Sequence, residues 1–227
     1  MVNGIDIFRE HFDNYKDQYT VIGGFACDLL MSDAGLDFRQ TVDIDMVIIV
    51  EALTTEFAKA FWDFIEAGGY HTRQRSTGQP EFYRFIDPAN PSYPKMIELF
   101  SRPQNHEELQ ADTHLIPLHI DDEVSSLSAI LLNDDYYHFL LDGRTVTDGI
   151  SILDAEHIIP LKMKAWLDLK SKKAQGFHVN SRDIRKHRLD VFRLFPLIRE
   201  DLRISVPSSL GRTSKTLLHR YVKLILD

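Results

Sequence analysis

Hydrophobic and polar positions along the chain predict short extended runs first and longer amphipathic segments later. Ile5, Phe8, Phe12 and Tyr15 recur near helical spacing, which predicts an N-terminal amphipathic helix. Extended runs are predicted at Tyr19–Ile22, Asp43–Val50, Tyr70–Arg75, Glu81–Ile86, Lys95–Phe100, His114–Ile120 and Tyr136–Leu141. Helices are predicted at residues 5–17, 25–31, 126–132, 154–174, 181–197 and 208–226, and from a cap at Thr54 or Thr55 to about Ala67.

The order of these elements predicts an α+β fold. Strands and helices alternate through the first part of the chain, and the pattern changes to long helices from Asp154 onward. We therefore expect a mixed β-sheet with flanking helices over residues 1–150, followed by a C-terminal helical bundle over residues 151–227. The boundary between the two falls near residues 149–153.

Composition places the chain among ordinary globular proteins. Hydrophobic residues make up 44% and charged residues 26% of its 227 positions. No apolar run approaches the roughly 20 residues that span a bilayer, and the N-terminus lacks the pattern of a signal peptide. A single cysteine, Cys27, excludes an internal disulfide and a multi-cysteine zinc site, and we expect its side chain to be buried. These features predict a cytoplasmic protein without a membrane partner.

The net charge of −8 is unevenly distributed. Residues 1–149 carry 10 Lys and Arg against 26 Asp and Glu, whereas residues 150–227 carry 16 against 8. Such asymmetry is typical of a basic part that recognises phosphates or nucleic acid. It is equally typical of two complementary surfaces that pack together, so charge alone leaves both interpretations open.

A glycine pair follows the first predicted strand. Gly23 and Gly24 lead from Tyr19–Ile22 into a predicted helix, which leaves backbone N–H groups free at the helix N-terminus. Glycine also permits a positive φ and a close approach of the backbone to a ligand. The pair is therefore a candidate triphosphate cradle, although most such pairs are turns only.

Two aspartates stand at the head of the second long strand. Asp43 and Asp45 alternate with Ile44, so both carboxylates face the same side of an extended strand. Adjacent carboxylates repel each other unless a positive charge lies between them, and Mg²⁺ prefers such oxygen ligands together with substrate phosphates. Glu98, an acid between apolar residues of a later strand, is the candidate third ligand to a pair of metal ions.

These residues resemble the motif of the nucleotidyltransferase superfamily of the DNA polymerase β type. The resemblance rests on the glycine pair, on Arg39-x-Thr41-x-Asp43-Ile44-Asp45 and on the later acid, and it covers residues 18–100. Within the superfamily the sequence is most similar to the AbiEii/AbiGii toxin-like branch. The resemblance implies a nucleotidyltransferase-like sheet, two Mg²⁺ ions with Mn²⁺ as an alternative, and an NTP bound by residues that include Arg39 and Thr41.

The predicted helices of the second half extend the resemblance. Leu161-Lys162-Met163-Lys164-Ala165 and the basic segment from Ser181 to His187 match its pattern. The family implies that Lys162 or Lys164 contacts nucleotide phosphates, that Asp183 helps to organise the site, and that Arg185 or Lys186 neutralises phosphate charge. Taken without the family, the helix from Ser181 has a core face and a solvated basic face. The predicted core face consists of Ile184, Leu189, Phe192 and Leu194. The predicted solvated face consists of Arg182, Arg185, Lys186 and Arg188.

The resulting hypothesis is a Mg²⁺-dependent enzyme that moves a nucleoside monophosphate from an NTP to an acceptor. By resemblance the acceptor is an RNA such as tRNA, or a protein hydroxyl, and the chain is the toxin of a toxin–antitoxin pair with an antitoxin partner. One alternative is a non-catalytic nucleotide- or RNA-binding protein on the same fold. Another is a small-molecule nucleotidyltransferase of the antibiotic type, which predicts an acidic acceptor pocket in the first half. An RNA acceptor predicts binding through the basic half that weakens steeply with salt.

Overall fold

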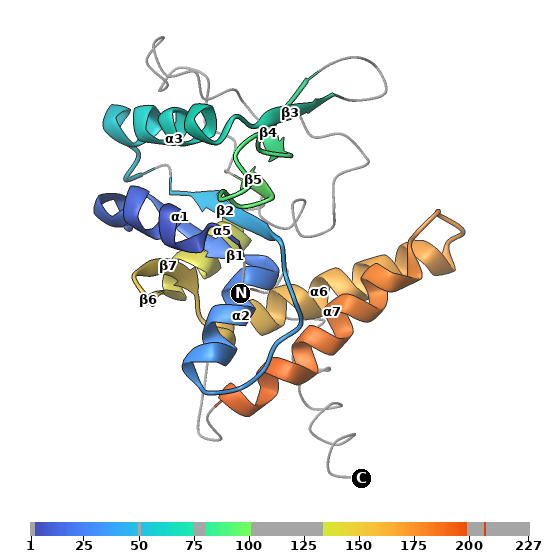
Figure 1. Ribbon diagram of the computed structural model, residues 1–227. Coiled ribbons are helices and arrows are strands. Elements are labelled where there is room, and N and C mark those ends of the chain that lie inside the picture. Colours follow the sequence, from blue (N-terminus) through green and yellow to red (C-terminus); the bar gives the residue numbers. More distant parts are fainter. Residues whose placement is uncertain (1–2, 50, 75–79, 101–133, 199–206, 208–227) are drawn as a thin grey trace. The chain divides into compact units, whose positions relative to one another are not determined.

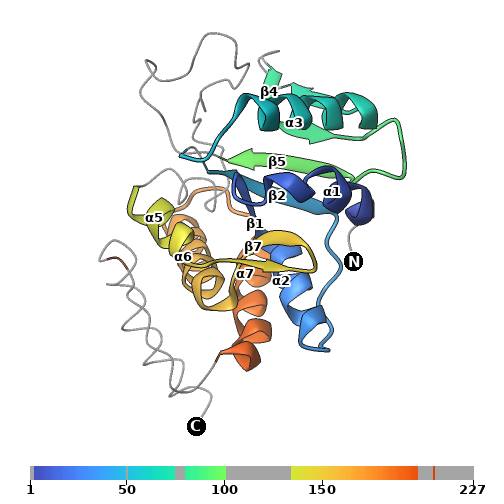
Figure 2. The same cartoon turned by 90° about the vertical axis from the view of Figure 1, so that its left-hand side faces the viewer.

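The computed structural model describes residues 3–49, 51–74, 80–100, 134–198 and 207. The chain divides into two compact units: a sheet unit, Met1–Ile120 with Arg144–Leu153, and a helical unit, Asp121–Gly143 with Asp154–Asp227. Figure 1 shows the elements of both in chain order, and Figure 2 shows them after a 90° turn. Among the described residues, no helix combines the length and apolar character needed to cross a bilayer.

The sheet unit is built on one mixed seven-stranded sheet of order β3-β4-β5-β2-β1-β7-β6. Its strands are β1 (Tyr19–Ile22), β2 (Asp43–Ile48), β3 (His71–Gln74), β4 (Pro80–Ile86), β5 (Met96–Phe100), β6 (Arg144–Thr147) and β7 (Ile150–Leu153). Central β2 runs antiparallel to β1 and parallel to β5. The end of β1 and the starts of β2 and β5 therefore meet at the same edge of the sheet.

An aromatic cluster packs two helices of this unit against β1. The helices are α1 (Ile5–His11) and α3 (Thr55–Gly68), and a 3₁₀ turn, η1 (Asp13–Tyr15), follows α1. The rings of Phe8 and Phe12 lie with centroids 4.8 Å apart, and both contact Tyr19 and Phe64 at centroid distances of 5.2–5.9 Å. Each of these four side chains is fully buried, and burial of such large rings supplies much of the free energy that holds the helices on the sheet.

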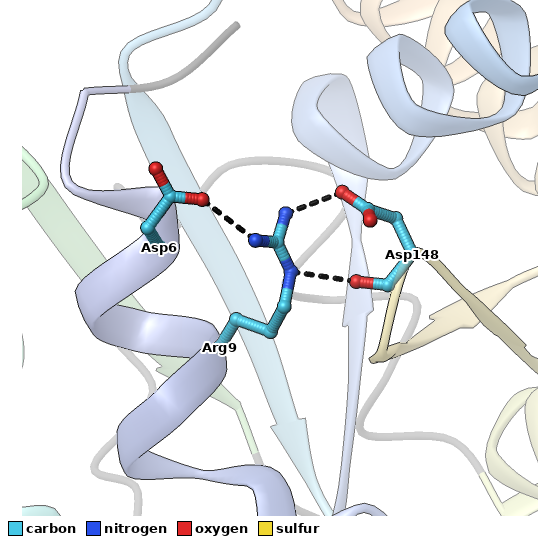
Figure 3. Close-up of polar contacts among 3 residues, drawn as sticks. All are labelled: Asp6, Arg9 and Asp148. Carbon is cyan, nitrogen blue, oxygen red and sulfur yellow. Dashed lines mark hydrogen bonds and ion pairs between the residues drawn. The ribbon is translucent and has the colours of Figure 1, made fainter.

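A two-residue turn closes the β6–β7 hairpin and is tied to α1. Asp148 and Gly149 have φ of 49° and 74°, the positive values that a tight hairpin turn requires. Arg9 donates from Nε to the Asp148 carbonyl at 2.7 Å and from its two terminal nitrogens to the carboxylates of Asp148 and Asp6 (Figure 3). One arginine of α1 thus holds the hairpin at the edge of the sheet.

The helical unit contains α5 (Asp134–Asp142), α6 (Ala155–Ala174) and α7 (Ser181–Leu194), with a 3₁₀ turn, η2 (Phe195–Leu197), after α7. Asp154 caps α6 by accepting from the His157 N–H, and Asn180 caps α7 by accepting from the Arg182 N–H. The long helices α6 and α7 pack side by side as a hairpin in both views.

The predicted fold class, a mixed sheet with flanking helices and helices after it, is confirmed. The predicted strands within the first 100 residues are present, and the predicted helices at residues 5–17, 25–31, 55–67, 154–174 and 181–197 are present with shifted ends. Cys27 is buried as predicted. The predicted elements at His114–Ile120, 126–132 and 208–226 lie outside the described residues.

For the middle of the chain, one prediction was wrong and one hairpin was not predicted. Residues Tyr136–Leu141, predicted as extended, belong to helix α5. Tyr136, Phe139 and Leu140 are all buried, and the last two lie three and four residues after the first, so a helix buries them on one face. The strands β6 and β7 were not predicted, because Arg144–Thr147 contains a single apolar residue, Val146, and so gives no extended apolar run that would mark a hairpin.

The core face predicted for α7 also needs correction. Phe192 is 37% exposed, whereas Asp190 and Val191 are buried beside Leu194. Val191 and Leu194, three residues apart, lie on the buried face of the helix, and Phe192 lies beside that face. The basic residues predicted to be solvated, Arg182, Arg185, Lys186 and Arg188, are exposed.

Candidate functional site

The turn between β1 and α2 (Gly23–Asp33) positions the glycine pair. Gly23 has a φ of +73°, a conformation that side-chain-bearing residues rarely adopt. A Cβ on Gly24 would lie 2.8 Å from Arg39 Nη2 and 2.9 Å from Thr41 Cγ2. The pair therefore allows the start of α2 to approach the segment that precedes β2.

Asp45 lies directly against this turn. The register pairs it with Ile22, and a Cβ on Gly23 would lie only 1.8 Å from Asp45 Oδ2. Asp43 occupies the same face two residues earlier, and Ile44 between them is fully buried. Both aspartates are half-buried. The predicted juxtaposition of the two carboxylates on one face, next to the glycine turn, is thus present in the backbone register.

Glu98 is the neighbour of Asp45 on β5. The parallel register pairs Asp45 with Glu98, and the antiparallel register of β4 places Arg84 on the other side of Glu98. Arg84 Nε donates to Glu98 Oε1 in an ion pair that is mostly shielded from solvent. The third predicted carboxylate therefore lies on the adjacent strand, where an arginine neutralises it.

These side chains fit a divalent cation held by two carboxylates. Mg²⁺ commonly takes one or two protein carboxylates and fills its remaining positions with water and substrate phosphates. Asp43 and Asp45 supply that set. Within the part of the chain that the structure describes, no three or more His, Cys, Asp or Glu side chains gather closely enough to hold a metal ion. A three-carboxylate centre would require Glu98 to exchange Arg84 for metal.

Thr41 provides an unsatisfied polar group at the same place. Its side chain is 7% exposed, and its Oγ1 finds no hydrogen-bond partner among the described residues. Leaving a buried hydroxyl unpaired costs about 1–3 kcal/mol. Arg39, two residues before it, lies over the ring of Phe38 at 5.2 Å. A hydroxyl in this position is suited to an oxygen-rich ligand beside Gly24.

A pocket of about 440 Å³ opens at the same edge of the sheet. We call it the Thr41 pocket; it is lined by Asn3, Gln40, Thr41, Val42, Asp87, Pro88, Pro91, Tyr93 and Lys95. Its volume lies within the range of small-molecule sites. Asp87 and Lys95 supply one negative and one positive group, so the lining has no surplus of acid.

The helical unit contains the predicted lysines, and each has a carboxylate partner. Lys162 is 2% exposed and its Nζ donates to Asp190 Oδ2 at 2.9 Å. Arg193 approaches the other oxygen of Asp190 at 3.8 Å. Lys164 pairs with Asp168 one turn along α6, in a position that remains partly exposed. Lys162 and Lys164 therefore differ in kind: the first is half of a buried ion pair, and the second is a surface pair.

The remaining predicted residues of this unit are exposed on α7. Asp183 lies in its first turn, and Arg185 and Lys186 follow on its outer side. The structure thus brings Gly23, Gly24, Arg39, Thr41, Asp45 and Glu98 together within the sheet unit. Lys162 is joined instead to Asp190, an aspartate that comes later than the family pattern expects and to which the sequence assigned no role.

Two residues with a bearing on the site were assigned no role from sequence. Arg84 stands between apolar residues on a strand beside Glu98, and Asp190 stands between Leu189 and Val191 on a helix. A charged residue in an apolar run is the signal for both, because a buried charge needs a partner.

Comparisons with solved structures give likenesses that include the following two. One is to an antigenic nucleotidyltransferase-like protein from Paracoccidioides brasiliensis, with a TM-score of 0.48 and 18% identity over 97% of this chain and 88% of that one. The other is to the antibiotic-resistance factor ANT(2'')-Ia, with a TM-score of 0.38 and 13% identity over 98% and 96% of the two chains. No family model matches the chain, and no curated protein matches it. At these values neither likeness establishes what this chain binds or does.

Proposed function

We propose that the chain is a metal-dependent nucleotidyltransferase that moves a nucleoside monophosphate from an NTP to an acceptor hydroxyl. The observation that supports it best is the contact of Asp45 with Gly23, where a Cβ would lie 1.8 Å from the carboxylate. This contact brings β2, the strand that carries both aspartates, against the glycine turn at the N-terminus of α2. Metal-ligating and phosphate-binding groups are thereby within reach of one polyphosphate.

The roles follow from the chemistry of the groups. Asp43 and Asp45 would hold Mg²⁺, or Mn²⁺, which when bound neutralises charge on the phosphates and the leaving group. Gly23 and Gly24 would offer backbone N–H groups at the start of α2 to the triphosphate, and Thr41 and Arg39 lie beside Gly24. The acceptor oxygen forms a bond to the α-phosphorus as the bond to the β-phosphate oxygen breaks and pyrophosphate leaves. Glu98, once free of Arg84, would accept the proton of the acceptor hydroxyl.

We further propose that cations of the helical unit bind nucleotide phosphate. Arg185 and Lys186 are exposed cations on α7, and Lys164 is partly exposed on α6. Lys162 is the weaker candidate for direct phosphate contact because Asp190 already accepts from its ammonium group. Asp183, exposed in the first turn of α7, would orient these cations. Any second metal ion would need Glu98 as a ligand.

An RNA such as tRNA is the acceptor that we favour over a cationic small molecule. A small-molecule enzyme of the antibiotic type predicts an acidic acceptor pocket, whereas the Thr41 pocket balances Asp87 against Lys95. The exposed basic face of α7 suits a polyanion. A protein hydroxyl as acceptor, and a toxin role with an antitoxin partner, belong to the same proposal through the resemblance to the AbiEii/AbiGii branch.

The Arg84–Glu98 ion pair favours one second candidate, a protein that binds nucleotide or RNA without turnover. An arginine that holds the third carboxylate would suppress both metal binding and proton transfer there. Mg²⁺-dependent NTP binding without transfer to any acceptor would support this candidate. Transfer that rises in Arg84→Gln would show that the arginine restrains an active centre.

The decisive experiment is label transfer in a cell extract. The protein is incubated with Mg²⁺ and each α-labelled NTP, and label is then sought in RNA, protein and small-molecule fractions. We expect Asp43→Ala and Asp45→Ala each to abolish transfer, whereas Asp63→Ala, which removes an exposed acid of α3, leaves it intact. Labelling that survives both substitutions on β2 would overturn the proposal.

A further inference from the structure

We infer that the tip of the α6–α7 hairpin binds a single-stranded segment of RNA. The tip consists of residues 170–182: the last turn of α6, the connecting turn and the start of α7. This inference rests on the proposed function only in taking RNA to be the acceptor, since the binding itself needs no transfer reaction.

The tip is strongly and uniformly positive. Lys170, Lys172 and Lys173 end α6, and Arg182 opens α7, with no Asp or Glu among residues 170–182. All four cationic residues are exposed. Lys173 Nζ donates to Ser181 Oγ, so cations of one helix lie against the first turn of the other. Arg185 and Lys186 continue the exposed charge along α7, interrupted only by Asp183.

An exposed phenyl ring stands within this charge. Phe177 is 61% exposed, the highest value among the exposed large hydrophobic side chains of the described residues. The turn that presents it is well formed: Gly176 has a φ of +89° and donates to the Lys173 carbonyl, and Phe177 donates to the Lys172 carbonyl. In this type of helix ending the residue after the glycine usually packs back onto the helix. Here the ring of Phe177 remains in solvent, so its burial contributes little to the stability of the fold.

Lysines around a solvent-facing aromatic ring match the chemistry of an unpaired nucleic-acid strand. Phosphates pair with exposed cations, and an unstacked base stacks on an aromatic face with little dependence on sequence. Proteins that stack bases on aromatic side chains do so mainly at single-stranded ends and loops of RNA. An anionic membrane surface would also attract the lysines, but one phenyl ring buries too little apolar area to anchor a helix hairpin in a bilayer.

The test measures binding of the full-length protein to a fluorescent single-stranded RNA oligonucleotide over a range of salt concentrations. Phe177→Ala should weaken binding about tenfold with little change in the salt slope, because it removes a stacking partner and no charge. Lys170→Gln with Lys172→Gln should reduce the steepness of log K against log salt by about 0.7 for each phosphate that the protein no longer neutralises. Phe192→Ala, which removes a 37% exposed ring elsewhere on α7, is the matched control and should bind like the wild type.

Two results would overturn the inference. One is RNA affinity that is equal in Phe177→Ala, Phe192→Ala and the wild type. The other is hairpin-dependent binding to anionic phospholipid vesicles in the absence of RNA binding. Duplex RNA of the same length should show the salt dependence without the effect of Phe177→Ala, since its bases are not free to stack.

The two proposals can fail separately. Asp45→Asn should bind the RNA oligonucleotide like the wild type, even where it transfers no nucleotide. Hairpin-dependent RNA binding by a protein that transfers no nucleotide in any extract would leave this inference standing and overturn the proposed activity. Transfer to RNA that is unaffected by both tip variants would support the proposed activity and overturn this inference.

Discussion

Replacing Gly23 with alanine tests the contact on which the candidate site depends. The substitution adds one methyl group to a residue at φ +73°, where its Cβ would meet Asp45 Oδ2 at 1.8 Å. Ordinary van der Waals contact begins at 3.4 Å, so the carboxylate would have to retreat by about 1.6 Å. The change therefore strains the backbone and displaces a proposed metal ligand together.

The two effects can be given separate magnitudes. A side chain in the left-handed region costs roughly 1–2 kcal/mol, part of which the stiffer unfolded chain offsets. Overpacking at a buried contact costs about 1–3 kcal/mol more. Gly35, at φ +71° just beyond the other end of α2, has no described heavy atom within 4 Å of its Cβ position. Gly35→Ala therefore carries the backbone cost alone and is the matched control.

Urea unfolding and thermal melting measure the difference. We expect Gly23→Ala to be less stable than Gly35→Ala by about 1–3 kcal/mol, with each kcal/mol lowering Tm by about 2–4 °C. In an Asp45→Ala background the extra loss should shrink, because the substitution removes the carboxylate that clashes. Nucleotidyl transfer, if present, should fall in Gly23→Ala and persist in Gly35→Ala. Equal stability of Gly23→Ala and Gly35→Ala would refute the reasoning.

Three further predictions concern the folding of the two units. Thr54→Ala removes the cap of α3 and should cost about 1 kcal/mol in urea unfolding, whereas the neighbouring Thr55→Ala should cost little. Lys162→Met should cost about 3–5 kcal/mol because it takes the ammonium partner from buried Asp190, and Lys162→Met with Asp190→Leu should recover most of that loss. Burial raises the pKa of the Tyr70 hydroxyl, so the folded protein retains a proton that the unfolded chain releases above about pH 10. Stability should therefore fall as pH rises beyond that value, and less steeply in Tyr70→Phe.

Local patterns determined which elements could be predicted from sequence. The apolar runs of β1 and β2 and the capped, amphipathic α3 carry signals long or strong enough to identify them. The β6–β7 hairpin carried a short-range turn signal, Asp148-Gly149, and was overlooked because Arg144–Thr147 contains one apolar residue and not an apolar run. Residues Tyr136–Leu141 suit a strand by propensity and a helix by spacing, and tertiary burial decides between them.

Charge partners explain why the candidate site could be only half predicted. Acids and lysines can be selected from sequence because their residue types suit phosphate and metal chemistry, but their counter-charges come from other elements of the fold. Glu98 is neutralised by Arg84 from a neighbouring strand, and Lys162 by Asp190 on the next helix. In both cases a shielded charge is stable only because of the pairing. A catalytic role for Glu98 therefore demands that a ligand compensate Arg84, and a phosphate-binding role for Lys162 demands that one compensate Asp190. A phosphate group carries the charge that could compensate Arg84, and a cation carries the charge that could compensate Asp190.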